Sequence, residues 1–112
     1  MPVRHRMKLT PESFDKVKSG EKKFEFRLND EKRKALKVGE RVEFAKLPEL
    51  ETSVIVEITS LHVFKNFSDL YKHFPEAVNG YSEIEFLDKM YGFYTKIEEE
   101  KYGVVAIGIK LV

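Results

Sequence analysis

Apolar and polar side chains alternate at the beginning of the chain. Between residues 4 and 9, Met7 and Leu9 fall on one face. The opposite face carries the three basic residues Arg4, Arg6 and Lys8. A period of two residues is typical of a strand with one buried face, so the pattern predicts a first strand here.

A helix is predicted directly after this strand. Thr10 is a suitable N-cap, Pro11 suits the first helical position, and Leu9 and Phe14 occupy the two positions of a hydrophobic staple. The helix is expected to end near Ser19, with Gly20 adopting the left-handed conformation that terminates it.

A second strand is predicted from residue 22 to residue 28. Its alternation places Phe24, Phe26 and Leu28 toward a core. The other face carries Lys23, Glu25 and Arg27, which we interpret as a row of charged side chains. This segment therefore combines a core-forming face with a candidate binding face.

The rest of the chain continues with strands and helices. We expect a charged connection with one helical turn over 29–37, strands over 41–45 and 53–61, helices over 68–74, 82–93 and 95–101, and a strand over 102–112. Ser68 is expected to cap the helix over 68–74, and Ser82 and Thr95 each begin a capping box. This order predicts one α+β domain over 1–112, with a barrel-like sheet that avoids open edges.

The sequence also predicts which residues of the later helices are buried and which are exposed. Helical spacing predicts a core stripe made of Ile84, Leu87, Tyr91 and Tyr94. The run from Glu98 to Glu100 is expected to be a solvated face. Phe67 and Tyr81, which stand just before predicted helix caps, are the aromatic residues that could stack on a nucleobase.

Composition limits the class of protein. The chain has 112 residues, 42% of them hydrophobic, which is enough for one core. Cysteine is absent, which excludes disulfides and thiolate chemistry, and no stretch approaches the length of a membrane span. We expect a cytoplasmic protein, a monomer, with no membrane partner and no cofactor. The three histidines are scattered, so no metal site is predicted.

Charge is distributed unevenly along the chain. Residues 1–46 contain 14 Lys and Arg against 8 Asp and Glu, whereas residues 47–112 contain 6 against 11. A positive pole can attract a polyanion even though the net charge is only +1. The alternative is that the charges simply solvate a small domain.

A short motif joins the first helix to the second strand. Gly20, Lys22, Glu25 and Arg27 fill every fixed position of the pattern G-x-K-x-x-E-x-R. This pattern resembles the signature of the ASCH domain family, whose fold is similar to the PUA domains of RNA-modifying enzymes. The run Val38-Gly39-Glu40 is similar to a second family landmark, with Glu40 where aspartate is usual. The resemblance implies a PUA-like β pseudobarrel of about five to six strands with flanking helices.

The resemblance also implies a function for the motif. It points to a cleft that binds RNA or a nucleoside-like ligand, in which Arg27 recognises phosphate or a base edge, Glu25 orients it and Lys22 supplies charge. The expected binding residues are Lys22, Glu25, Arg27, Arg6, Lys8 and Lys34. The alternative for the motif is a surface ladder of ion pairs of small energetic value.

An enzymatic alternative stays open. Some ASCH proteins resemble small amidohydrolases that cleave N4-acetylcytidine with a lysine, a threonine and a glutamate. The lysine corresponds to Lys22, but the threonine position holds Glu25, which cannot act as a hydroxyl nucleophile. A hydrolase acting on N4-acetylcytidine would use Lys22 as a base with Glu25 as its acid partner, and cleavage of RNA would use Lys22, Glu25 and Arg27. A third possibility is a regulatory module with no nucleic-acid role.

Overall fold

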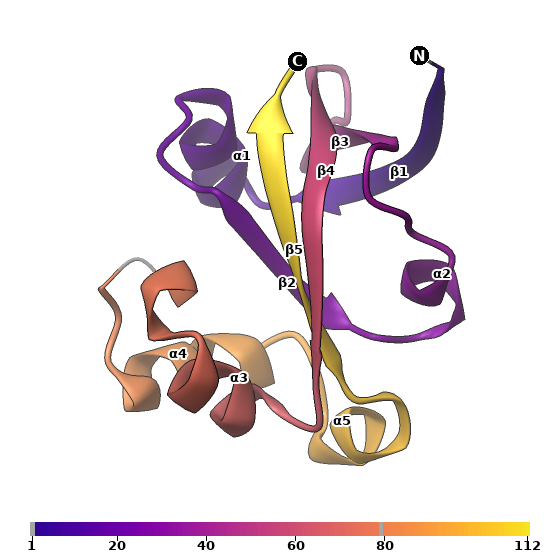
Figure 1. Ribbon diagram of the computed structural model, residues 1–112. Coiled ribbons are helices and arrows are strands. Elements are labelled where there is room, and N and C mark those ends of the chain that lie inside the picture. Colours follow the sequence, from indigo (N-terminus) through magenta and orange to yellow (C-terminus); the bar gives the residue numbers. More distant parts are fainter. Residues whose placement is uncertain (1, 79) are drawn as a thin grey trace. The chain divides into compact units, whose positions relative to one another are not determined.

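The computed structural model describes residues 2–78 and 80–112 and has an α+β fold (Figure 1). The elements are β1 (Val3–Leu9), α1 (Pro11–Lys18), β2 (Phe24–Leu28), α2 (Glu31–Lys34), β3 (Arg41–Lys46), β4 (Ser53–Phe64), α3 (Phe67–His73), the 3-10 turn η1 (Pro75–Val78), α4 (Glu83–Tyr91), α5 (Lys96–Tyr102) and β5 (Val104–Leu111). The predicted fold class and the predicted order of strands and helices are confirmed.

The five strands form one sheet in the order β1-β3-β4-β5-β2. β1 runs parallel to β3 and places Met7 opposite Phe44, whereas β3 and β4 are antiparallel and place Phe44 opposite Val54. Because parallel neighbours need a crossover between them, the chain inserts α1, β2 and α2 between β1 and β3. The register of β1 shifts between Val3 and His5.

The chain divides into two compact units. The first unit comprises Met1–Glu25, Leu36–Leu61 and Gly108–Val112. The second comprises Phe26–Ala35 and His62–Ile107. The single domain expected over 1–112 stays a prediction.

The first unit has a core built from α1 and its neighbouring strands. α1 packs against β1 and β3. The buried side chains are Met7, Leu9, Phe14, Val17, Val42, Phe44, Val56 and Ile58. The inward positions predicted for β1 are therefore confirmed, and α1 buries Phe14 and Val17 in the same core.

Local interactions define the two ends of α1. The Thr10 hydroxyl accepts a hydrogen bond from the backbone N–H of Ser13 at 3.4 Å, which caps the first turn. Gly20 has φ of +83°, the left-handed conformation that ends the helix. Both features agree with the prediction. The chain can then turn back toward β2.

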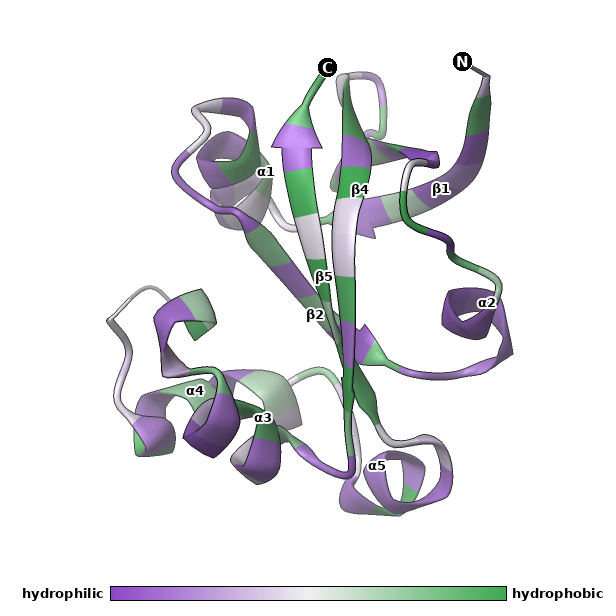
Figure 2. Cartoon of the chain, viewed as in Figure 1, coloured by the Kyte–Doolittle hydropathy of each residue, from purple (hydrophilic) through white to green (hydrophobic). Residues whose placement is uncertain are grey.

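The second unit has an aromatic core. The ring of Phe67 lies edge-on to Phe86 at 6.0 Å and stacks on Tyr94 at 5.8 Å, while Phe26 meets Phe86 edge-on at 5.2 Å. α3 packs against α4, and Figure 2 shows apolar residues along most of β5. Phe67 is fully buried, so the prediction that it could stack on a nucleobase is wrong.

The buried face of α4 differs from the prediction. Phe86 and Met90 are buried, whereas Ile84 is 75% exposed. Phe86 and Met90 lie one residue before Leu87 and Tyr91 of the predicted stripe, and Leu87, Tyr91 and Tyr94 are half-buried. The buried face is therefore rotated by about 100°, the turn of one residue in a helix. The side chain that caps α3 is Asn66, which accepts from the N–H of Asp69 at 2.8 Å, rather than Ser68. Both predicted capping boxes, at Ser82 and Thr95, are present.

Glu99 is buried, although the sequence predicts a solvated face. Its carboxylate accepts hydrogen bonds from the backbone N–H of Phe67 and from the hydroxyl of Tyr91, both at 2.8 Å. The N–H of Phe67 belongs to the first turn of α3 and has no partner within the helix. Glu99 therefore satisfies a helix terminus inside the second unit.

Candidate functional site

The most distinctive polar feature of the first unit is an ion pair within the motif. Lys22 Nζ lies 2.7 Å from Glu25 Oε1, and the two side chains are only 11% and 8% exposed. After Gly20 reverses the chain, the backbone N–H of Lys22 donates to the carbonyl of Lys16 at 3.0 Å. This bond fixes the backbone from which the Lys22 side chain reaches Glu25.

The burial of Glu25 corrects the predicted row of exposed charge. Glu25 is buried, and it forms an ion pair with Lys22, whose side chain is only slightly more exposed. A carboxylate is removed from water in this way only when it is paired and hydrogen-bonded. The interpretation of the motif as a surface ladder of ion pairs is therefore wrong for Lys22 and Glu25.

Ser13 joins this pair from α1. Its hydroxyl oxygen lies 3.5 Å from Lys22 Nζ, and the residue is buried on the inward face of the helix next to Phe14 and Val17. Sequence analysis did not identify Ser13. The signal that could have found it is a serine at an inward position of a helix whose other inward residues are apolar.

A pocket of about 280 Å³ lies beside Lys22. It is lined by Val17, Gly20, Lys22, Lys23, Val56, Ile109, Lys110 and Leu111, all of which belong to the first unit. The volume is just below the range of about 300–1,000 Å³ that is usual for small-molecule sites. The pocket thus combines an apolar lining with lysines, and only Gly20 and Lys22 of its lining residues belong to the predicted motif.

The other predicted binding residues are distributed over both units. Arg27 is partly exposed on β2 and belongs to the second unit, as does the exposed Lys34 on α2. Arg6 and Lys8 are exposed on β1 of the first unit, as predicted. Arg6 and Lys34 have carboxylate neighbours. Arg6 Nε lies 3.0 Å from Glu43, and Lys34 Nζ lies 3.7 Å from Glu31.

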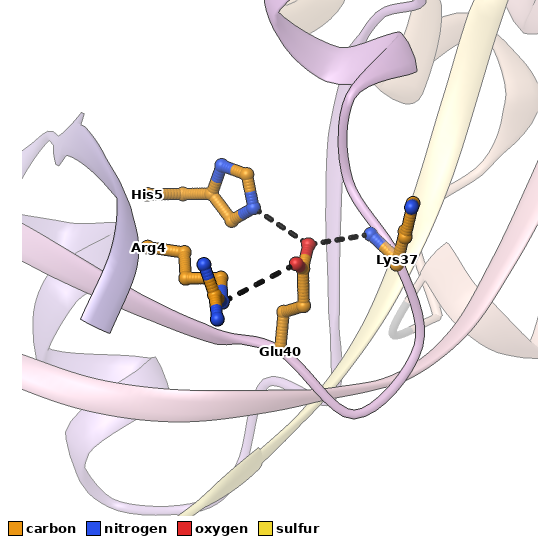
Figure 3. A network of polar contacts seen from close by, with 4 residues as sticks. All are labelled: Arg4, His5, Lys37 and Glu40. Carbon is orange, nitrogen blue, oxygen red and sulfur yellow. Dashed lines mark hydrogen bonds and ion pairs between the residues drawn. The ribbon is translucent and has the colours of Figure 1, made fainter. Parts of the chain in front are cut away.

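Glu40, in the second landmark, is the centre of another polar network (Figure 3). Its carboxylate accepts from His5 Nε2 at 2.8 Å and from the backbone N–H of Lys37 at 3.0 Å, and it lies 3.7 Å from Arg4 Nε. The hydrogen bond with His5 is the main cause that lowers the pKa of Glu40 below its ordinary value. This network ties β1 to the turn before β3, which makes its role in the first unit structural.

Comparison with known families identifies the class of protein. The sequence profile of the ASCH domain matches residues 7–112. The chain belongs to the ASCH domain family, and its sheet and helices have the ASCH/PUA-like pseudobarrel fold. The resemblance seen in the motif is thereby confirmed over almost the whole chain.

Several solved structures are similar to this one. The hypothetical protein PH0355 is 33% identical, with 96% of this chain and 98% of that chain covered and a TM-score of 0.82. The protein PF0455 from Pyrococcus furiosus is 29% identical, with coverages of 97% and 98% and a TM-score of 0.71. An ASCH protein from Zymomonas mobilis shares the fold at 16% identity, with coverages of 98% and 70% and a TM-score of 0.67. No curated protein matches the chain.

Within residues 2–78 and 80–112, no three His, Asp or Glu side chains come together as ligands for a metal ion. In the same residues, no helix combines the length and the hydropathy that crossing a membrane requires.

Proposed function

We propose that this ASCH domain binds RNA or a nucleoside-like ligand, and that the pocket beside Lys22 receives one nucleoside-sized unit. The buried pair of Lys22 and Glu25 carries the proposal. Removing two charges from water is expensive, and replacing such a pair by apolar residues is often neutral or stabilising. A functional role for the pair therefore explains its presence better than stability does.

The pocket supports a small ligand with an apolar face and polar edges. Val17, Val56 and Ile109 are buried and apolar, which suits the face of a base or the carbons of a ribose. Lys22 lines the same pocket and carries hydrogen-bond donors suited to a carbonyl or phosphate oxygen. A volume of about 280 Å³ favours one nucleoside unit over a longer segment.

The remaining basic residues are proposed as contacts to the rest of an RNA strand. Arg27 presents a planar fork that suits phosphate or a base edge. Arg6, Lys8 and Lys34 are exposed and would contribute phosphate contacts, which give affinity and salt sensitivity but little sequence preference.

A hydrolase acting on N4-acetylcytidine or on RNA is the second candidate. The observation that favours it is the short contact of 2.7 Å between Lys22 and Glu25, across which a proton could pass during acid–base catalysis. Lys22 also lines the pocket, whereas Ser13 is absent from its lining, so the serine hydroxyl is a poor candidate for the nucleophile. In this reading Lys22 and Glu25 would act on a bound water.

A titration of labelled single-stranded RNA at two salt concentrations tests the proposal. The double variant Lys22→Met/Glu25→Met removes both charges together, so that neither is left buried without the other. We expect it, like Arg27→Ala, to weaken binding by about 1–3 kcal/mol, whereas Lys34→Ala should mainly reduce the salt dependence, by a slope of about 1. Equal small losses from all three variants would remove the case for a specific site.

A parallel assay of N4-acetylcytidine hydrolysis separates the two candidates. Deacetylation by the wild type that disappears in the double variant would assign the site to an enzyme. RNA binding without any turnover supports the binding module. A lack of both activities in the wild type would reject both candidates.

A further inference from the structure

We propose that Ser13 is a positioning residue, which together with Glu25 holds the amine of Lys22 at the wall of the pocket. This inference deepens the proposed function and rests on it for the role of Lys22 toward a ligand. The contact itself, between the Ser13 hydroxyl and Lys22 Nζ at 3.5 Å, belongs to the structure of the first unit and can be tested without any ligand.

Burial of polar side chains is rare in this chain and is concentrated at Lys22. Among residues 2–78 and 80–112, the buried polar or charged residues are Ser13, Glu25 and Glu99. Two of these three contact the same atom, Lys22 Nζ. The third, Glu99, has a separate structural role at α3. The burial of Ser13 and Glu25 therefore has one common explanation, which is the lysine amine between them.

The hydroxyl of Ser13 is not required by the helix that carries it. Capping of α1 uses the backbone N–H of Ser13, which donates to Thr10, and leaves the hydroxyl uninvolved. The neighbouring inward residues Phe14 and Val17 are apolar. Alanine has a higher helix propensity than serine and would satisfy both the cap and the burial. The hydroxyl is explained by its contact with Lys22.

The two anchors come from different segments and therefore restrict a flexible side chain. Glu25 stands three residues after Lys22 on β2, whereas Ser13 stands nine residues before it on α1. A lysine side chain has four rotatable bonds and loses much conformational entropy when it is fixed in one rotamer. Contacts from two directions establish that position before a ligand arrives, which reduces the cost of binding.

Chemical labelling of lysines tests the contact directly. Wild type, Ser13→Ala and Ser13→Thr are treated with an amine-acylating reagent, and the rate at each lysine is read by mass spectrometry. We expect Ser13→Ala to raise the rate at Lys22 by about two- to tenfold, the equivalent of one hydrogen bond, and Ser13→Thr to restore it. The control is Ser53→Ala, which changes an exposed serine at the start of β4 in the same unit and should leave the rate at Lys22 unchanged.

Ligand affinity is the second readout, with cytidine as the probe followed by NMR. Ser13→Ala should weaken cytidine binding by a similar factor, and thermal melting should confirm that the variant folds. An unchanged labelling rate at Lys22, or a changed rate with unchanged cytidine affinity, overturns the positioning role. If instead Lys22→Met/Glu25→Met binds cytidine like the wild type, the proposed function fails and the labelling rate alone still decides the Ser13 contact.

Discussion

Removing one charge of the buried pair should destabilise the protein far more than removing both. In Lys22→Met, Glu25 loses its lysine partner at a site where its side chain is only 8% exposed. Breaking a buried ion pair by removing one partner costs about 3–5 kcal/mol. Lys22→Met/Glu25→Met leaves no charge behind, and we expect its free energy of unfolding to lie within about 1 kcal/mol of the wild type or above it.

The unfolding entropy, which scales with chain length, relates this loss of stability to a change in melting temperature. At about 2.1 cal/mol/K per residue, the 112 residues give an unfolding entropy near 0.24 kcal/mol/K, so each kcal/mol is worth about 4 °C. The single variant should therefore melt about 12–20 °C lower. Circular dichroism follows the thermal transition, and tyrosine fluorescence follows urea unfolding, since the chain has five Tyr and no Trp.

An exposed ion pair provides the matched control. Lys34 and Glu31 lie 3.7 Å apart with side chains 51% and 88% exposed, so Lys34→Met should cost less than about 1 kcal/mol. If Lys22→Met were equally mild, the pair would be solvated and the argument from burial would fail. If the double variant were as unstable as the single one, the pair would stabilise the fold, and the case for a functional role would be lost.

Three other perturbations have defined outcomes. The His5 hydrogen bond lowers the pKa of Glu40, so the free energy of unfolding of the wild type should decrease as the pH falls below about 4.5. Glu40→Gln should lose less stability over the same pH range, as measured by acid unfolding. Burial, and secondarily the hydrogen bond to Glu99, raises the pKa of Tyr91 to about 12. Glu99→Gln should lower this pKa, as measured by ultraviolet titration of tyrosinate. Because the phenol loses its proton at a lower pH in the unfolded chain, wild-type stability should fall between pH 10 and 12. Gly108→Ala should cost about 1–3 kcal/mol in urea unfolding, because its methyl group would collide with hydroxyl side chains of β4; a neutral effect would mean that this contact can relax.

Elements set by neighbouring residues could be predicted from the sequence. The ends of α1 depend on Thr10 and Gly20, and the starts of α4 and α5 depend on capping boxes at Ser82 and Thr95. In each case the interacting groups lie within a few residues of each other, so the sequence contains the whole interaction. Strand alternation in β1 was predictable for the same reason.

Burial of individual polar residues could not be predicted in this way. Glu25 and Glu99 both stand in charged runs that look solvated, yet both are buried. Glu99 is held by the N–H of Phe67, which is distant in sequence. Whether a carboxylate faces water depends on which segment covers it, and that is decided by long-range packing.

The sequence by itself determined the family of this protein, the class of its fold and the motif of its candidate site, because a short pattern and local periodicities carry that information. The tertiary structure alone decided that Lys22 and Glu25 form a buried pair, that Ser13 on α1 reaches the same amine, and that a pocket opens beside it. These features require α1, the start of β2 and the end of β5 to lie close together within the first unit. A sequence pattern describes the spacing of residues along the chain, and it does not specify which side chains the folded chain brings into contact.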